Sequence, residues 1–306
     1  MAQDKKDFID LNQFSKEELL SLLESCHDRK NSKKRSGHAT VDDDQIGSGK
    51  ILATIFEKPS TRTRFSFEVA MFQLGGKTIN VSMNDMQLGR GETVQDTAKV
   101  LSRYVDLAML RTFEHSTILD FAMNSTIPVI NGLSNQSHPC QVLTDLMTVE
   151  EKLNSLDSKI FTWFGPANNL LNSWIHASDV LNFELRICAP EEYQVADEII
   201  KGPKSNIIKI SDVNEASKNS NCIITDTWFS MGEDHEPDKE KILEPYRVDK
   251  SKIEKADKDV IFLHCLPAHR GQEVEDDVID GPYSVVWDEA ENRVHAQKAI
   301  IDWCLS

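Results

Sequence analysis

Residues 51–65 read Ile-Leu-Ala-Thr-Ile-Phe-Glu-Lys-Pro-Ser-Thr-Arg-Thr-Arg-Phe, and this stretch decides the fold class. Its first six residues are mostly apolar or β-branched, which is typical of a buried strand. Pro59 and Ser60 are residue types that the start of a helix prefers. The stretch therefore predicts a strand that leads directly into a helix, with Phe65, Val69 and Phe72 among the buried positions of that helix.

The same order of strand, loop and helix recurs along the chain. The predicted strands lie at 51–56, 78–81, 107–110, 127–130, 160–164, 185–188, 207–210, 222–225 and 260–264. Strands that alternate with amphipathic helices predict parallel sheets made of right-handed βαβ units. We therefore expect an α/β protein of two domains. Each would be a mostly parallel sheet flanked by helices, linked by inter-domain helices, with the boundary near the helix that Pro139 opens.

The structure of three further segments can be predicted from their sequence. Ser15 and Glu18 form a capping box, and Leu19, Leu22, Leu23 and Cys26 follow on one face of the predicted first helix. Residues 28–50 lack periodicity and predict a mobile surface loop, in which residues 33–35 (Lys-Lys-Arg) form a solvated turn rather than a phosphate site. Residues 232–241 are acidic and predict a long loop.

Composition limits the possible partners and cofactors. The 306 residues carry a formal net charge of −16, which argues against a nucleic-acid partner. No stretch approaches 18 apolar residues, and the six cysteines form no CxxC pair, so we expect a cytoplasmic protein with reduced thiols and no membrane contact. The nine histidines show no HExxH spacing and a GxGxxG fingerprint is missing, so neither a metal nor a cofactor is expected.

The residues between the first strand and its helix suit a phosphate group. A helix N-terminus offers backbone N–H groups and a partial positive charge. Ser60, Thr61 and Thr63 add hydroxyls, and Arg62 adds a guanidinium. The alternative is a capped surface helix with exposed arginines. A Ser-Thr-Arg-Thr-Arg run at a strand-to-helix junction favours phosphate binding instead.

Two residues of the first half, His138 and Arg111, indicate a function only in combination with this predicted phosphate site. His138 precedes Pro139, where an imidazole can donate a hydrogen bond to a carbonyl oxygen. Arg111 lies at the end of a predicted strand. Taken alone, such a histidine is more often a helix-capping residue, and such an arginine is more often a surface charge.

In the second half, polar side chains follow three predicted strands. These are Asn169, Asp226 and Cys265, and in an open parallel sheet ligands bind beyond the carboxyl ends of the strands. The set suits a zwitterionic amino acid, with Asp226 for the ammonium and Asn169 for the carboxylate. The alternatives are that Asn169 is a turn residue, that Asp226 is a helix cap, and that Cys265 is a small buried hydrophobic residue. His264 and Cys265 would point to opposite faces if they lay on a strand, which disfavours a nucleophilic pair.

These residues, in this order from about residue 51 to the C-terminus, resemble the aspartate/ornithine carbamoyltransferase family. Residues 60–64 (Ser-Thr-Arg-Thr-Arg) and 138–141 (His-Pro-Cys-Gln) resemble its two carbamoyl phosphate signatures. Residues 226–232 (Asp-Thr-Trp-Phe-Ser-Met-Gly) and 264–267 (His-Cys-Leu-Pro) resemble its ornithine branch. The chain departs from the family at 165–169, where it has Gly-Pro-Ala-Asn-Asn instead of Gly-Asp-Gly-Asn-Asn, and Pro166 stiffens that loop.

The resemblance implies transfer of a carbamoyl group from carbamoyl phosphate to the side-chain amine of L-ornithine, in arginine metabolism. It implies a carbamoyl phosphate-binding domain at 1–145, on which helix 290–306 packs back, and an ornithine-binding domain at 146–289. It also implies a homotrimer, with Gln87 reaching the neighbouring subunit. Two other readings remain: a carbamoyltransferase for another amine, such as putrescine or an N-acylated ornithine, and a non-catalytic amino-acid-binding subunit.

The resemblance also assigns roles to individual residues. By this resemblance the catalytic residues are expected to be Arg111, His138 and Cys265. The residues that contact carbamoyl phosphate are Ser60, Thr61, Arg62, Thr63, Gln87, Arg111, His138, Gln141, Cys265, Leu266 and Arg293. The residues that bind ornithine are Asn169, Asp226, Ser230 and Met231.

Overall fold

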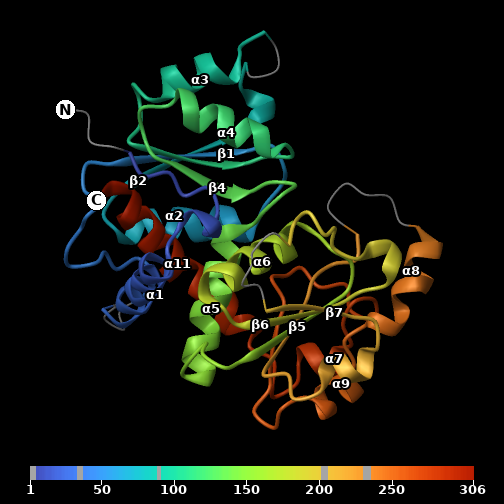
Figure 1. Cartoon of the computed structure of the whole chain (residues 1–306). Coiled ribbons are helices and arrows are strands. Elements are labelled where there is room, and N and C mark those ends of the chain that lie inside the picture. Colours follow the sequence, from blue (N-terminus) through green and yellow to red (C-terminus); the bar gives the residue numbers. More distant parts are fainter. Residues whose placement is uncertain (1–4, 33–36, 88–90, 201–205, 230–235) are drawn as a thin grey trace. The chain divides into compact units, whose positions relative to one another are not determined.

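The structure is a computed structural model, and it describes residues 5–32, 37–87, 91–200, 206–229 and 236–306 (Figure 1). The chain divides into two compact units. The first comprises Met1–Thr144 and Glu291–Ser306, and the second comprises Asp145–Ala290. The chain leaves the first unit within helix α5 (Pro139–Leu153) and returns to it within helix α11 (Val286–Leu305).

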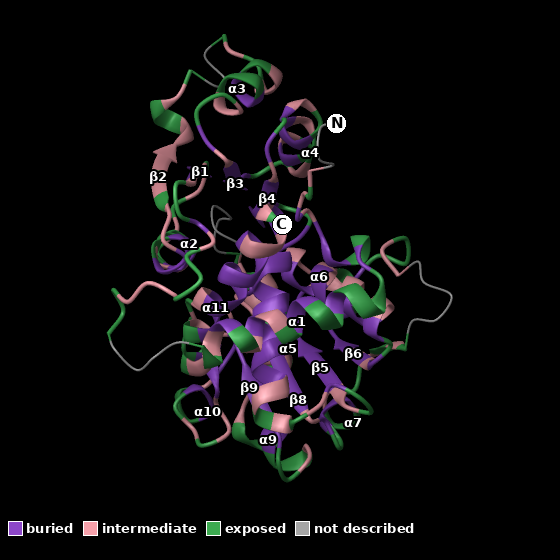
Figure 2. Ribbon diagram, turned by 90° about the vertical axis from the view of Figure 1, so that its left-hand side faces the viewer, coloured by how far each residue is buried: buried purple, intermediate pink, exposed green. Residues whose placement is uncertain are grey.

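The first unit contains a four-stranded parallel sheet in the order β2-β1-β3-β4. Its strands are β1 (Ile51–Phe56), β2 (Lys77–Ser82), β3 (Leu107–Arg111) and β4 (Val129–Leu133). The associated helices are α1 (Lys16–Asn31), α2 (Arg62–Gln73), α3 (Val94–Leu101) and α4 (His115–Asn124). β3 is buried at every position, whereas β2 at the sheet edge is only partly covered (Figure 2).

The second unit contains a five-stranded parallel sheet in the order β7-β6-β5-β8-β9. Its strands are β5 (Ile160–Phe164), β6 (Glu184–Cys188), β7 (Ile207–Ile210), β8 (Cys222–Thr225) and β9 (Ile261–Leu263). Its helices are α6 (Asn169–Leu181), α7 (Val213–Ser217), α8 (Pro237–Leu243), α9 (Lys250–Lys255) and α10 (Asp276–Ile279). The predicted α/β class with two parallel sheets is confirmed.

Each sheet has one point at which the chain changes its direction of winding. In the first unit β1 is followed by β2 on one side, while β3 and β4 lie on the other side. In the second unit β5 is followed by β6 and β7 on one side, while β8 and β9 lie on the other. Ligands of open α/β sheets bind outside the carboxyl ends of the strands at such a point. The expected site residues should therefore follow β1 and β3 in one unit, and β5 and β8 in the other.

The prediction for the buried face of α2 was wrong. The helix begins at Arg62 rather than at Pro59 and Ser60, and its inward face carries Phe67, Ala70 and Met71. Phe65 is 65 % exposed and Phe72 is 48 % exposed. Phe65 precedes Phe67 by two residues, which on an α-helix turns its side chain roughly 200° away from that face. Both phenylalanines therefore lie toward solvent in this chain.

The first helix follows its prediction, but the segment after it does not. Ser15 and Glu18 form the reciprocal capping box, and the four expected apolar residues are buried on α1. The segment from residue 28 is not simply a surface loop, because α1 continues to Asn31 and buries Arg29. The basic residues 33–35 lie outside the described residues. In the predicted acidic loop, α8 begins at Pro237, and residues 232–235 are likewise not described.

Over the described part of the chain, no helix combines the length and apolar character needed to span a bilayer.

Candidate active site

In the first unit, Thr63 is the centre of a buried polar cluster. Its hydroxyl oxygen accepts hydrogen bonds from Arg111 Nη1 at 3.1 Å and from Arg293 Nη2 at 2.9 Å. Arg293 Nη1 also donates to Gln141 Oε1. Thr63, Arg111, Gln141 and Arg293 are each at most 5 % exposed. Two guanidinium groups thus converge on one hydroxyl, at the N-terminus of α2.

The elements of the sheet explain why these residues meet. Thr63 follows β1 and Arg111 ends β3, and the two strands are hydrogen-bonded neighbours with Phe56 in register with Arg111. The loop after β4 leads into α5, which carries Gln141. The cluster therefore lies at the carboxyl ends of parallel strands, beside the change in winding direction, which is where this type of sheet binds ligands.

His138 lies in the field of these arginines. It is 6 % exposed, and its pKa is lowered well below the usual value, first by burial and then by the charges of Arg293, Arg111 and Arg62. The imidazole is therefore neutral at physiological pH, and one ring nitrogen carries a proton that it can donate. A neutral donor among fixed cations suits an oxygen that gains negative charge.

The remaining expected phosphate contacts differ in their exposure. Ser60 and Arg62 are half-buried, and Thr61, at the N-cap of α2, is exposed and makes no side-chain capping bond in the described structure. Gln87 is exposed, and its carbonyl accepts from the Glu92 N–H at 3.4 Å. Ser60, Thr61 and Arg62 are thus at least partly accessible to solvent, whereas Thr63, which follows them, is buried.

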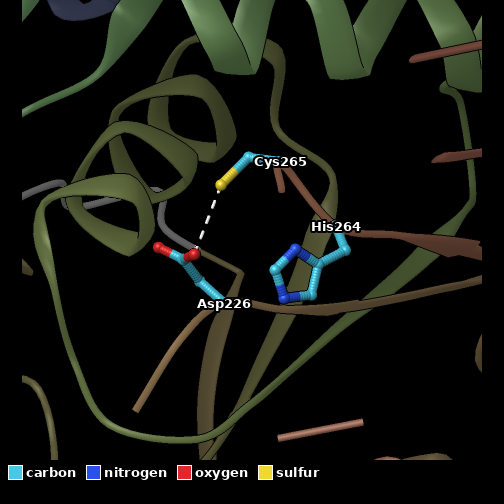
Figure 3. A group of neighbouring side chains, drawn as sticks. All are labelled: Asp226, His264 and Cys265. Carbon is cyan, nitrogen blue, oxygen red and sulfur yellow. Dashed lines mark hydrogen bonds between the residues drawn. The ribbon is translucent and has the colours of Figure 1, made fainter. Parts of the chain in front are cut away.

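In the second unit, Asp226 is the centre of a second polar cluster (Figure 3). One carboxylate oxygen accepts from Asn168 Nδ2 at 2.8 Å. The other accepts from the Thr227 N–H at 2.8 Å and from the Cys265 thiol at 3.2 Å. The thiol and the carboxylate point toward each other, with the His264 ring beside them. Asp226 follows β8, Asn168 follows β5 and Cys265 comes after β9, so this cluster too lies at the carboxyl ends of the strands.

Cys265 is held as a thiol. Burial raises its pKa well above the usual value, and the carboxylates of Asp226, Glu289 and Asp145 raise it further. A thiolate is the form that attacks an acyl carbon. At physiological pH this side chain is therefore a hydrogen-bond donor to Asp226 and not a nucleophile.

The expected opposition of His264 and Cys265 was wrong. β9 ends at Leu263, so neither residue lies on a strand, and polar atoms of Asp226, His264 and Cys265 all lie within 4.8 Å of one another. This is metal-ligand spacing. However, His264 Nδ1 accepts the Leu266 N–H at 2.9 Å, and Nε2 is 3.3 Å from Glu273 Oε1. The imidazole lone pair already accepts a hydrogen bond within the loop. A metal would also need Cys265 as a thiolate, and burial and the neighbouring carboxylates disfavour that form.

Asn168 is a functional candidate that the sequence reasoning missed. Its Oδ1 caps α6 by accepting from the N–H groups of Leu170 and Leu171, while its Nδ2 binds Asp226. Asn169 is the first residue of α6 and is half-buried, and Leu266 is half-buried as well. The Asn-Asn pair before an apolar helical run was a capping signal that could have identified Asn168. Ser230 and Met231 lie outside the described residues.

Two parallel sheets, one with a cationic cluster and one with an anionic cluster at the carboxyl ends of its strands, define an α/β protein for small charged ligands. Residues 6–151 match the aspartate/ornithine carbamoyltransferase, carbamoyl-P binding domain. Residues 157–304 match the aspartate/ornithine carbamoyltransferase, Asp/Orn binding domain. The chain belongs to the aspartate/ornithine carbamoyltransferase family.

Individual relatives are similar to this chain in sequence or structure over nearly its whole length. An ornithine carbamoyltransferase of Bradyrhizobium diazoefficiens is 46 % identical over 307 residues, covering 99 % of this chain and 98 % of the relative. The structure is similar to that of an ornithine carbamoyltransferase from Pyrococcus furiosus, with a TM-score of 0.92, 43 % identity, and 98 % and 97 % of the two chains covered. An anabolic ornithine carbamoyltransferase from Campylobacter jejuni gives a TM-score of 0.89 at 41 % identity, with 98 % and 99 % covered.

The state of His138 can be measured directly. Because its pKa is lowered, the folded protein binds fewer protons here than the unfolded chain does, so this residue costs stability only as the pH falls below about 6.5. We expect the ¹⁵N resonances of the His138 ring in the ligand-free protein to stay those of a neutral imidazole from pH 8 to pH 6. His138→Gln identifies the signals. A titration midpoint near 6.5 would show that neither burial nor the arginines lower the pKa of this ring.

Proposed function

We propose that this protein catalyses transfer of the carbamoyl group of carbamoyl phosphate to the side-chain amine of L-ornithine, which gives L-citrulline and phosphate. The observation that carries the proposal is the convergence of Arg111 and Arg293 on Thr63, in a chain with a net charge of −16. Such a chain concentrates buried cations at one point for an anionic ligand. The relatives named above bear the same activity in their names.

The first unit would bind the phosphorylated substrate. Ser60, Thr61, Arg62 and Thr63 surround the N-terminus of α2, where N–H groups and the helix dipole favour a phosphate. Arg293 would add a second guanidinium to the departing phosphate, and Gln141 would orient that guanidinium through its hydrogen bond. We assign the carbamoyl phosphate-binding domain to 1–145, together with helix 290–306.

The carbonyl oxygen of the carbamoyl group would be held by Thr63, Arg111 and His138. This oxygen gains negative charge when the amine attacks, and preorganised donors stabilise it without reorganisation at that moment. Because His138 donates as a neutral imidazole, the positive charge that stabilises this oxygen comes from Arg111. Loss of one such donor typically lowers the rate by about a hundredfold or more.

The second unit would bind the amino acid. Asp226 offers its carboxylate to the α-ammonium group, and Asn169 together with Ser230 and Met231 would hold the rest of the amino acid. Asn168 fixes the Asp226 carboxylate from the β5 side, so we add it as a positioning residue. We assign the ornithine-binding domain to 146–289.

The transfer would proceed by direct attack of the uncharged amine on the carbamoyl carbon. Cys265 is protonated, so it does not form a covalent intermediate, and its role is to orient Asp226 and, with Leu266, to contact the reacting groups. The C–N bond forms as the C–O bond to phosphate breaks, and phosphate leaves with the electron pair of that bond. The proton that the amine loses passes to the departing phosphate. No cofactor is required, because alignment of the two substrates supplies much of the acceleration.

We further propose that the protein is cytoplasmic, acts in arginine metabolism and is a homotrimer. Phe65 and Phe72 are exposed on α2, and Ile79 is 49 % exposed on the edge strand β2. Large exposed apolar side chains near an open strand edge favour a covered surface in an assembly. In a trimer, the exposed Gln87 would reach carbamoyl phosphate bound by the neighbouring subunit.

The activity is tested by citrulline formation with a panel of amines. We expect product with L-ornithine and less than about a hundredth of that rate with putrescine or N-acetylornithine, which lack one charge of the amino acid. Asp226→Asn should raise the ornithine KM by about 10- to 100-fold, because a hydrogen bond to a charged group contributes about 1.5–3 kcal/mol. The carbamoyl phosphate KM should change by less than about twofold.

Asp197→Asn, whose side chain is 91 % exposed in the same unit, serves as the matched control and should behave as wild type. Equal effects of Asp226→Asn on both KM values would remove Asp226 from the amino-acid site. A faster reaction with putrescine would identify the other carbamoyltransferase, and binding without product would identify a non-catalytic subunit.

The assembly is tested by sedimentation equilibrium. We expect a mass three times the 34.6 kDa of one chain, and dissociation on Phe65→Asp, because a carboxylate would then be desolvated in the apolar contact. Met123→Asp changes a side chain on α4 that is 77 % exposed and should leave the mass unchanged. A monomeric wild type that still makes citrulline would refute the trimer without refuting the activity.

A further inference from the structure

Helices α2 and α11 are tied together at both ends of α2. At its N-terminal end, Thr63 accepts the hydrogen bond from Arg293 of α11. At its C-terminal end, the carbonyl of Gln73 accepts the N–H of Asp42 at 2.7 Å. The Asp42 carboxylate in turn accepts from Lys298 Nζ of α11 at 2.7 Å. All these contacts lie within the first unit.

The Lys298–Asp42 pair is unusual in its burial. The Lys298 side chain is completely buried, and that of Asp42 is 7 % exposed. Two charges taken out of water cost several kcal/mol each, so such a pair contributes little to stability compared with apolar residues of similar volume. Buried ion pairs are in some proteins retained because they fix one geometry among several. This pair can therefore be important for the position of α11, the helix that also carries Arg293.

Neighbouring contacts reinforce the same position of α11. Lys30 Nζ donates to Asn292 Oδ1 at 2.7 Å, directly beside Arg293. The Arg29 carbonyl lies 3.5 Å from Lys298 Nζ, and the Arg29 guanidinium pairs with Asp302 one turn beyond Lys298. The end of α1 thus contacts α11 on both sides of the stretch from Arg293 to Lys298.

We infer that Lys298 and Asp42 are positioning residues for carbamoyl phosphate, which act through Arg293. Arg293 and Lys298 are five residues apart, which is about 7.5 Å along the axis of one rigid helix. The Lys298–Asp42 contact fixes the translation and rotation of this helix against α2, so that the Arg293 guanidinium reaches Thr63 and the phosphate beside it. Misplacement of a binding group by about 1 Å can cost about a hundredfold in rate. This inference rests on the proposed function of the Thr63 cluster.

The test is Lys298→Met, which keeps the length and apolar stem of the side chain and removes the charge. We expect the carbamoyl phosphate KM to rise about tenfold, and calorimetry with inorganic phosphate to show binding about tenfold weaker. The ornithine KM should change less than about twofold. Lys298→Arg, which keeps the charge, should restore most of the phosphate binding.

Two further variants separate positioning from simple loss of stability. Asp42→Asn should weaken phosphate binding to a similar degree. The Asp42 carboxylate also lies 3.6 Å from Arg29 Nη1, so Asp42→Asn weakens that pair as well. The double variant Asp42→Asn with Lys298→Met should be no weaker than Asp42→Asn alone, because the Lys298–Asp42 contact is already lost in that variant. The matched control is Asp44→Asn, since Asp44 binds Arg29 at 2.7 Å in the same network but its side chain is 48 % exposed. Its phosphate binding should equal that of wild type.

If Lys298→Met does not fold, the comparison of Asp42→Asn with Asp44→Asn decides the question. Unchanged phosphate affinity in folded Lys298→Met or Asp42→Asn would overturn the inference, and so would an equal rise in both KM values. A wild-type protein that binds neither carbamoyl phosphate nor inorganic phosphate would instead refute the proposed function, and the two failures are therefore distinguishable.

Discussion

The hydrogen bonds from Arg111 and Arg293 to the single hydroxyl of Thr63 are the constraint on which the first unit depends. Because both guanidinium groups donate to one oxygen, at 3.1 and 2.9 Å, their like charges repel each other at this buried point. The fold accepts this repulsion in its interior, at the N-terminus of a helix whose dipole adds to the positive potential. A phosphate at this point would turn the repulsion into attraction. Burial, together with the same field, lowers the pKa of His138 and keeps it neutral, so that the ring can donate without adding a further positive charge.

The second unit uses the opposite electrostatic arrangement at the equivalent position of its own sheet. Asp226 receives donors from three different loops, and each holds the carboxylate in one orientation: an amide of Asn168, the backbone of Thr227 and the thiol of Cys265. Because burial and the neighbouring carboxylates raise the pKa of Cys265, its proton is retained and covalent catalysis is disfavoured. The loop that carries this thiol is held in turn by His264, through Glu273 and the Leu266 N–H.

Much of this arrangement could be predicted from the sequence because it depends on local order along the chain. Strand runs such as 51–56 and 160–164 have the bounds found in the structure, since β-branched residues and loop signals mark both ends. The alternation of strands and helices places their carboxyl ends together, which brings Thr63 to Arg111 without knowledge of any side-chain contact. The aromatic residues of α2 were misassigned because hydrophobicity alone does not tell which face of a helix meets the sheet. Phe65 and Phe72 look like core residues and are not. Lys298 and Asp42 escaped notice for a different reason: their pairing spans 256 residues, and nothing local marks a charge as buried.

We expect a phosphate group to bind where α2 begins, against the two arginines that meet at Thr63. A crystal structure of the protein with carbamoyl phosphate tests it most directly. Phosphate density should appear at the Ser60–Thr63 turn, within hydrogen-bonding distance of the α2 N–H groups and of Arg293, with the carbamoyl oxygen toward Arg111 and His138. Clear density for the ligand elsewhere, or an unoccupied turn at a ligand concentration that saturates the enzyme in solution, would contradict it.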